Sequence, residues 1–225
     1  MKYSMVVFLS IFLIVGALAG SAPGVDLNEN EYYEPEENDF VQLQVLDDKV
    51  TAFRSRNPST PVRLDVGEKI LIQKEDGNVG AVVTNTRFLA VSAGSNSWLS
   101  ESLHTGEGDS AELMVGKEIA MMVTGQRIIG YSAGVDRIFT YPLSVGDNVM
   151  AKDVGQRVGV VVLPDRAVGF SATSAGFSTV RFDYGGAFRS LETAAAMALV
   201  ETDNRIYAYR AAGGTWSVQD IPPGE

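Results

Sequence analysis

The sequence contains no cysteine, and its only histidine is His104. Without cysteine no disulfide can form, and a lipid anchor attached to cysteine is excluded. A zinc site made of cysteine and histidine is excluded by the same counts. A histidine-based catalytic triad would have to use His104, which lies among glycines in residues 103–108 and is expected to be a solvated loop side chain. The fold must therefore be held by its core alone.

A basic surface is also missing. The chain has 28 acidic and 18 basic residues and a formal net charge of −10. Seven of the acids lie in residues 26–39, which contain no lysine or arginine, whereas residues 40–225 carry 21 acids and 17 bases. This balance excludes the basic patch that binds nucleic acid or anionic membranes. Because calcium-loop and phosphate-loop motifs are absent too, we expect no metal and no cofactor.

Only one long apolar run is present. It begins at Met5, after Lys2, and ends with small residues at Ala17 and Ala19, as in the cleavage site of a secretory signal peptide. The run is shorter than the ~20 residues that span a bilayer. We therefore expect residues 1–19 to be a signal peptide, and the mature protein to be periplasmic or extracellular with no membrane span. An uncleaved membrane anchor is the alternative.

A repeated pattern covers residues 40–225. A basic residue recurs after a turn at intervals of 38 to 40 residues. An apolar run lies before each turn. A second run starts at the basic residue, and in it the third residue after the basic one is small and the fourth is large and apolar. A third short run follows, and a more polar fourth run precedes the next unit. The five basic residues are Lys49, Arg87, Arg127, Arg166 and Arg205.

Two such runs joined by a two-residue turn are typical of a β-hairpin. Four short strands in a repeated unit of about 40 residues are the signature of β-propeller blades. The sequence thus resembles a five-bladed β-propeller with four-stranded blades, although it lacks the Trp-Asp dipeptide of WD40 blades and the double glycine of kelch blades. We expect an all-β fold with one domain over residues 40–225. The apolar first strand of each unit would line the axis, and the polar fourth strand would form the rim.

The fifth unit ends after residues 216–221 without a fourth strand. An unpaired last blade would leave an exposed strand edge. Residues 30–34, with Tyr32 and Tyr33, occupy the place of a fourth strand upstream of the first unit. We predict that this segment pairs with the strand at Trp216 and closes the fifth blade. The alternative is that residues 20–39 form a disordered acidic segment.

The residues Gly130-Tyr-Ser-Ala-Gly134 have the spacing of a hydrolase nucleophile elbow. The same serine recurs as Ser92 and Ser171, and another strand follows it rather than a helix. We therefore interpret Ser132 as the end of a repeated strand and Gly134 as part of the turn that follows.

Two sets of repeated residues are candidates for ligand binding. The five basic residues start strands after equivalent turns, so they would form a ring on one propeller face that attracts anions. Pairing with turn carboxylates such as Asp48, Asp165 or Asp203 is the alternative. Three aromatic residues open the third strand of their units, and they would stack on sugars if exposed or pack between blades if buried. They are Trp98, Phe177 and Trp216.

No set of catalytic groups emerges. Glu201 is the only carboxylate inside a first strand, whereas glycoside hydrolysis requires two facing acids. We favour a non-catalytic exported scaffold that binds a protein partner on one propeller face. One alternative is a lectin-like binder of carbohydrate between the blades. A second is a hydrolase with a carboxylate or metal site at the channel mouth, where Glu201 would meet Asp147 or Asp153 within about 10 Å.

Overall fold

The computed structural model of the protein describes residues 39–58, 60–183 and 186–222. Apart from two short 3-10 turns, Gly108–Ser110 (η1) and Ala212–Gly214 (η2), the regular elements in these residues are β-strands. No helix in this part of the chain is long and apolar enough to cross a membrane. The predicted all-β class is confirmed. The expected signal peptide (1–19) and the predicted closing segment (30–34) lie outside the described residues.

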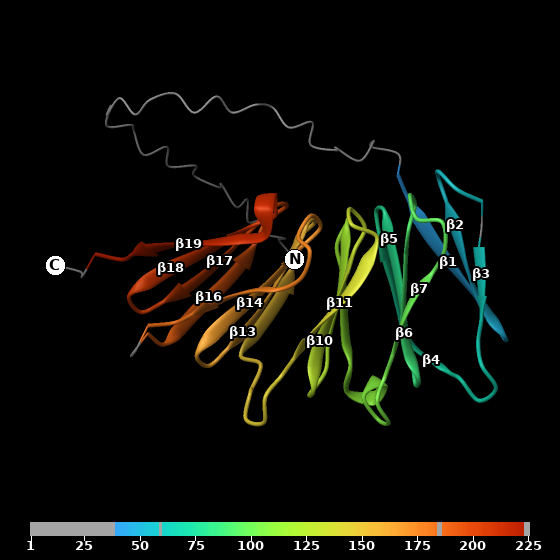
Figure 1. Ribbon diagram of the computed structural model, residues 1–225, viewed down its shortest axis with the longest axis horizontal. Helices are drawn as coiled ribbons and strands as arrows, with labels where there is room; N and C mark the ends of the chain where they lie inside the picture. The colour runs from blue at the N-terminus through green and yellow to red at the C-terminus, as the bar shows by residue number, and fades with distance from the viewer. Residues whose placement is uncertain (1–38, 59, 184–185, 223–225) are drawn as a thin grey trace, which may run out of the picture. The chain divides into compact units, whose positions relative to one another are not determined.

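The strands form five antiparallel sheets, each made of strands that follow one another in the chain (Figure 1). Blade 1 contains β1 (Val41–Leu46), β2 (Lys49–Arg54) and β3 (Thr60–Arg63). Blade 2 contains β4 (Ile70–Asp76), β5 (Val79–Thr84), β6 (Arg87–Ser92) and β7 (Leu99–Ser102). Blade 3 contains β8 (Glu112–Val115), β9 (Ile119–Val123), β10 (Arg127–Ser132) and β11 (Arg137–Pro142). Blade 4 contains β12 (Ala151–Val154), β13 (Val158–Leu163), β14 (Arg166–Ser171) and β15 (Ser178–Arg181). Blade 5 contains β16 (Phe188–Thr193), β17 (Met197–Thr202), β18 (Arg205–Arg210) and β19 (Thr215–Asp220).

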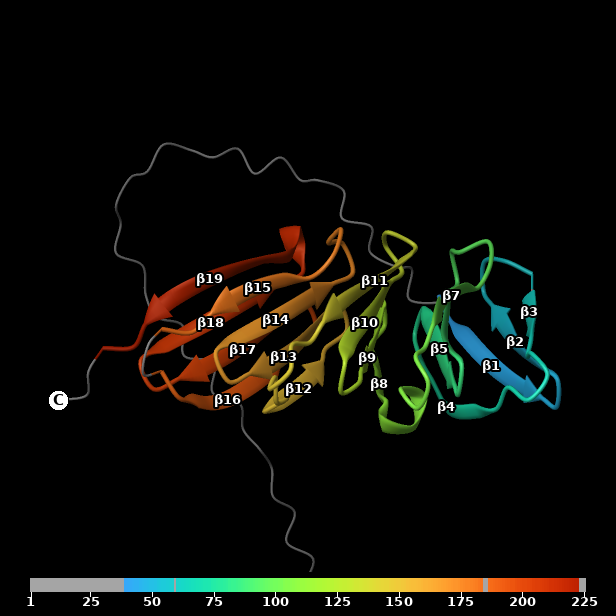
Figure 2. The ribbon, with the colours of Figure 1, turned by 60° about the horizontal axis from the view of Figure 1, so that its bottom comes forward.

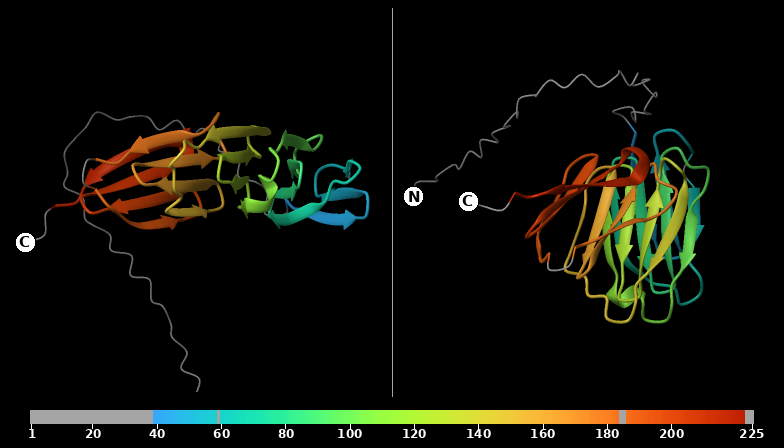
Figure 3. Two further views of the ribbon diagram at one scale, coloured as in Figure 1. Left: turned by 90° about the horizontal axis from the view of Figure 1, so that it is seen from below. Right: turned by 60° about the vertical axis from the view of Figure 1, so that its left-hand side comes forward.

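These sheets are the blades of a β-propeller, and each packs against the blade before or after it in the chain. Figures 2 and 3 show the blades in chain order, from blade 1 in blue to blade 5 in red. Blades 2 to 5 have four strands, and blade 1 has three among the described residues. The predicted five-bladed architecture is confirmed.

The predicted boundaries of the blades are wrong by one strand. The sequence pattern assigns the polar strand before each unit to the preceding blade, but β4, β8, β12 and β16 pair with the strand that follows them. The cause is local, because a turn of only two residues joins β4 to β5 and folds them into a hairpin. A longer connection, residues 64–69, separates β3 from β4. Blade 5 therefore has four strands without the N-terminal segment.

The predicted place of the apolar strands is also wrong. The strands β5, β9, β13 and β17 are interior strands with a hydrogen-bonded neighbour on each side, so they do not line an axis. Every residue of β5 and β13 is buried. Such continuous apolar runs arise because neighbouring blades cover both faces of the strand.

Consecutive blades interlock through the strands that start with the repeated basic residue, which we call the anchor strands (β2, β6, β10, β14 and β18). The small residue of each anchor strand makes room for the large residue of the next one. A Cβ added to Gly130 would lie 2.8 Å from the Phe170 ring, so no larger residue fits there without a shift. Gly169 lies against Tyr209 in the same way. At the other two junctions the corresponding residues share a buried cluster. They are Ala52 with Val91, and Ala90 with Tyr131.

Candidate functional site

Two of the repeated arginines hold buried glutamates of the connection that leads into their own blade. Arg87 donates from Nε to Glu68 Oε1 and from Nη2 to Glu68 Oε2, both at 2.8 Å. Arg127 binds Glu107 in the same bidentate way, at 2.8 and 2.9 Å. Burial opposes the ionisation of Glu68, but the hydrogen bonds from Arg87 and Thr84 outweigh it and lower the pKa of Glu68 to about 2. Both glutamates are therefore charged partners at neutral pH.

The other basic residues are paired less completely. Arg166 binds Asp147 at 2.5 Å and the turn residue Asp165 at 2.7 Å. Arg205 binds Asp220 at 2.7 Å and also contacts Asp183. Lys49 is half-buried and forms no ion pair with a residue that the structure describes. Of the predicted turn partners, Asp165 is used by its own arginine, whereas Asp203 binds Arg189 instead.

The sequence reasoning missed the main partners of these arginines, although a signal was present. A glycine followed by an acid occurs 19 or 20 residues before Arg87, Arg127 and Arg166. The acid also accepts a hydrogen bond from the backbone of its own turn. In the first case the backbone N–H of Asp65 donates to the Glu68 carboxylate at 2.7 Å. The arginine also reaches the preceding blade, since Arg87 Nη2 donates to the Arg63 carbonyl at 2.6 Å.

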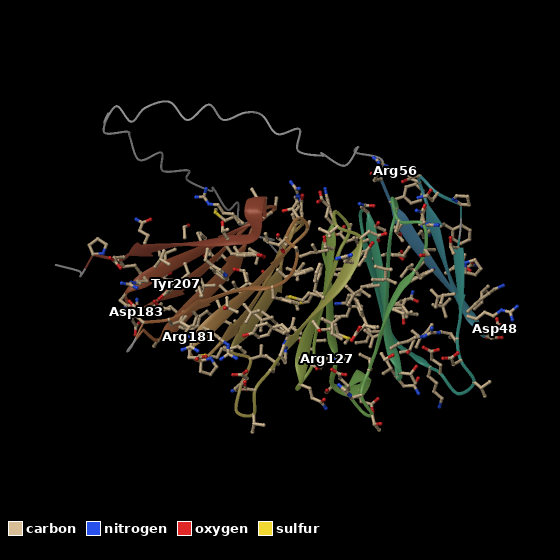
Figure 4. The ribbon with its side chains drawn as sticks, viewed as in Figure 1. Asp48, Arg56, Arg127, Arg181, Asp183 and Tyr207 are labelled. Atoms are coloured by element: carbon tan, nitrogen blue, oxygen red, sulfur yellow. The ribbon has the colours of Figure 1, made fainter. Side chains whose placement is uncertain are left out.

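Each of these arginines thus joins three pieces of chain. Figure 4 shows Arg127 toward the same side of the blades as Asp48, the residue before Lys49. Because the guanidinium of Arg127 is already held by carboxylates, an anionic ligand would have to displace one of them. Three of the five predicted cations, Arg87, Arg127 and Arg166, thus act as ties to the preceding blade in this geometry.

The three repeated aromatic residues pack between blades. The indole N–H of Trp98 donates to the Thr60 carbonyl of blade 1 at 2.8 Å, and that of Trp216 donates to the Ser178 carbonyl of blade 4 at 3.2 Å. Phe177 packs on Phe170 of its own blade, with ring centroids 4.8 Å apart, and on Tyr141 of blade 3, with ring centroids 5.9 Å apart. All three are partly buried. This arrangement gives no support to stacking platforms for sugars.

The serine of the elbow-like stretch is not placed for nucleophilic attack. Ser132 is fully buried at the end of β10, and its Oγ donates to the Ala172 carbonyl of blade 4 at 2.5 Å. The equivalent Ser171 donates to the Ala211 carbonyl of blade 5 at 3.3 Å. The side chain of His104 is exposed. Ser132 therefore ties one blade to the next, as its interpretation as a repeat position implies.

The acids of the hydrolase alternative are each engaged elsewhere. Glu201 accepts a hydrogen bond from Ser190 Oγ at 3.3 Å. Asp147 binds Arg166, and Asp153 accepts a hydrogen bond from Thr193 at 2.5 Å. Among the described residues, no three histidine, aspartate or glutamate side chains gather as metal ligands would. The contacts of these residues do not bring Glu201 together with a second acid.

Blades 1 and 5 each carry an anchor-strand residue that has no counterpart in a neighbouring blade among the described residues. Phe53 is the large residue of β2, and it is 42% exposed, whereas its counterparts Val91 and Tyr131 are fully buried. It borders a shallow hollow of about 340 Å³ with Gln42 and Gln44. We call this surface the Phe53 face.

At the other end of the series, Ala208 is the small residue of β18. It is partly exposed and lies in a groove of about 550 Å³ on blade 5. We call this surface the Ala208 groove. Its other apolar lining residues are Met197, Leu199, Ile206 and Val218.

The first residue of the turn between the first two strands of a blade also differs in blade 5. A Cβ added to Gly116 would lie 2.0 Å from the Gly155 carbonyl oxygen, and one added to Gly155 would lie 2.0 Å from that of Ala194. Glycine is thus required where the next blade follows closely. Blade 5 has Ala194 at the equivalent position, and this residue is exposed. The sequence shows that alanine replaces glycine here, but only the structure shows that the glycines of the inner blades allow close contact with the turn of the next blade.

No family model and no curated protein matches the sequence. Solved structures of β-propeller proteins resemble the fold at low identity. Prp20p from Saccharomyces cerevisiae, whose report covers its binding to Gsp1p and histones, is 10% identical, with a TM-score of 0.37 over 76% of this chain and 55% of its own. Hsv2 from Kluyveromyces lactis is 10% identical, with a TM-score of 0.37 over 80% and 60%. YCF48 from Cyanidioschyzon merolae is 10% identical, with a TM-score of 0.34 over 78% and 67%. The chain spans little more than half the length of the first of these structures.

Proposed function

We propose that this protein is a non-catalytic binding module that holds a protein partner on an end face of its series of blades. The observation that carries the proposal is the Ala208 groove. In the inner blades the equivalent small residues, such as Ala52 and Ala90, are fully buried, whereas Ala208 and Leu199 remain partly exposed. An apolar groove that is open to solvent marks a docking surface.

The composition of the groove suits a protein partner. Its lining combines the partly buried Met197, Leu199, Ile206 and Ala208 with the exposed polar residues Arg210 and Gln219. Protein interfaces commonly combine an apolar centre with a polar rim, and methionine and arginine are enriched in them. A scaffold role also fits the rest of the chain, because its arginines and aromatic residues connect blades to one another.

The proposal includes export. It is supported by the apolar run before Ala19 and by the absence of cysteine, which leaves the fold independent of the redox state outside the cell. N-terminal sequencing of the protein from the medium or periplasm should give a chain that starts near Gly20. A cell-associated chain that starts at Met1 would contradict export without affecting the binding proposal.

The binding proposal is tested with three tagged forms of the protein: the natural sequence, Ala208→Arg, and Val66→Arg as a matched control. Val66 is a fully exposed loop residue, so the control adds the same charge away from the groove. Proteins captured from the source culture are identified by mass spectrometry, and each candidate is then purified and titrated directly.

We expect at least one protein to bind the natural sequence and Val66→Arg equally and to bind Ala208→Arg at least tenfold more weakly. The partner can include the untagged chain itself. If every captured protein binds all three forms alike, the groove is not the binding site and the proposal fails.

A further inference from the structure

We infer that the partner of the Ala208 groove is a second copy of this chain, which inserts its Phe53 into the groove. This inference rests on the proposed function and names the partner. The contact would repeat between two molecules the packing that already joins blade to blade within one molecule.

The first argument is the complementarity of the two ends. At two junctions inside the chain the large residue of one anchor strand lies on the small residue of the preceding anchor strand, and at the other two the corresponding residues share a buried cluster. Among the described residues, Phe53 is the large residue without a small partner, and Ala208 is the small residue without a large partner. Gly130 receives Phe170, so a phenylalanine is already used in this role within the chain. The two end surfaces thus carry the two halves of one interlocking contact.

The second argument is charge. At the junction between blades 1 and 2, Arg87 donates to the carbonyl of Arg63, the residue paired with Lys49 across the strands. At the junction between blades 2 and 3, Arg127 donates in the same way to Ser102, which is paired with Arg87. The equivalent position in blade 5 is Asp220, which is paired with Arg205.

The same packing would place Lys49 of the second copy at Asp220. Lys49 forms no ion pair with a described residue of its own chain, and the side chain of Asp220 is 79% exposed. A lysine without an ion pair among the described residues would therefore meet an acid that is largely exposed and is bound in its own chain by Arg205. The aromatic contact and the charge contact are independent, yet they arise from one placement of the two molecules.

The geometry also determines the kind of association. The contact joins the first blade of one copy to the last blade of another, so it is heterologous and either closes into a ring or continues as a chain of molecules. Ala194 stands where inner blades need glycine for a close turn contact. Because its Cβ prevents the closest approach at that turn, we expect a reversible association that depends on concentration.

The decisive experiment uses the absence of natural cysteine. Two purified proteins, Phe53→Cys and Ala208→Cys, are mixed and treated with a short bismaleimide. We expect crosslinked dimers in the mixture and few with either protein alone. The control mixture pairs Val66→Cys with Ala208→Cys, which offers an exposed thiol outside the Phe53 face. A mixture that crosslinks no more than this control overturns the inference.

A double variant with cysteine at both positions tests the remaining arrangement. At nanomolar concentration, where molecules rarely meet, efficient crosslinking within one chain would mean that blades 1 and 5 cover each other, and the inference would be wrong. Intermolecular products that rise with concentration are the expected result.

Sedimentation of the purified protein gives a measurement without crosslinking. Phe53→Asp should abolish association, Val66→Arg should leave it unchanged, and Lys49→Glu should weaken it and be rescued by Asp220→Lys on the other copy. The protein could prove to be a monomer at every concentration and yet bind a different protein that Ala208→Arg no longer binds. That result would refute self-association and leave the proposed function standing. A monomer without any groove-dependent partner would refute both.

Discussion

Gly169 of β14 lies directly against the aromatic ring of Tyr209 of β18, so closely that a Cβ on Gly169 would be 2.7 Å from Tyr209 Cδ2. Tyr209 is fully buried in the cluster that joins blades 4 and 5. A glycine in a strand interior is otherwise unfavourable, and here it is explained by the close approach of the next blade. The same relationship between a small and a large residue recurs between Gly130 and Phe170 at the junction of blades 3 and 4.

The first prediction concerns this contact. Gly169→Ala should lower the free energy of unfolding by about 1–3 kcal/mol, because the added methyl group forces the Tyr209 ring out of its packed position. Urea denaturation followed by tryptophan fluorescence measures the change. Gly125→Ala is the matched control, because nothing lies near its added Cβ. Equal stability of Gly169→Ala and Gly125→Ala would show that the two blades do not interlock there.

The second prediction concerns pH. The pKa of Glu68 is lowered from 4.5 in the unfolded chain to about 2 in the fold, so its contribution to stability is complete above about pH 4.5 and disappears as the pH falls toward 2. Glu68→Gln should lose about 3 kcal/mol at pH 7, since it leaves Arg87 without its charged partner. Its stability should also fall less steeply than that of the natural protein between pH 4.5 and 2.

The exposed pair of Arg189 and Asp203 provides the comparison for this prediction. Asp203→Asn should leave the stability at pH 7 nearly unchanged, because exposed ion pairs contribute little. If Glu68→Gln behaves like Asp203→Asn, the buried glutamates do not tie the blades as described.

The third prediction concerns Ser132. A fluorophosphonate that labels active serine hydrolases should not react with it, because its Oγ is buried and donates to the Ala172 carbonyl. Ser132→Ala should instead cost about 1 kcal/mol of stability through the lost hydrogen bond. Labelling of the natural protein that vanishes in Ser132→Ala would contradict this structural role.

The fourth prediction concerns the two tryptophans, Trp98 and Trp216, which are the only ones in the chain. Trp216→Phe should lower stability by about 1 kcal/mol or more, because phenylalanine cannot donate to the Ser178 carbonyl. Titration with oligosaccharides should leave the tryptophan fluorescence of the natural protein unchanged. A saturable change with sugar that Trp216→Phe removes would favour a carbohydrate site instead.

Much of the fold follows from local features of the sequence. The repeated hairpins are set by short turns and apolar runs, so the number of blades and the anchor strands Lys49–Arg54 and Arg87–Ser92 could be read directly. The polar strand Ile70–Asp76 was harder to assign, because periodicity does not tell which neighbour a strand pairs with. Turn length would have decided it, since only two residues separate Asp76 from Val79.

The candidate surfaces could not be recognised in the same way. The small and large residues of an anchor strand are adjacent in the sequence, but their contacts are made with different blades. Ala208 and Phe53 fit the repeat like any other residues, and they differ only in lacking a neighbouring blade. The glutamates that bind Arg87 and Arg127 come from connections 19 and 20 residues away, beyond the range of turn chemistry.

The central claim is that Phe53 remains uncovered within a single chain while its counterparts are buried. The most direct measurement is the rate at which a maleimide reacts with single cysteines in Phe53→Cys and Val91→Cys, at concentrations where the protein is monomeric. Because Phe53 is 42% exposed and Val91 is fully buried, we predict fast labelling at position 53 and labelling at position 91 only through unfolding. Equally slow labelling at both positions would mean that blade 1 is covered on both faces within one chain, and would contradict the account.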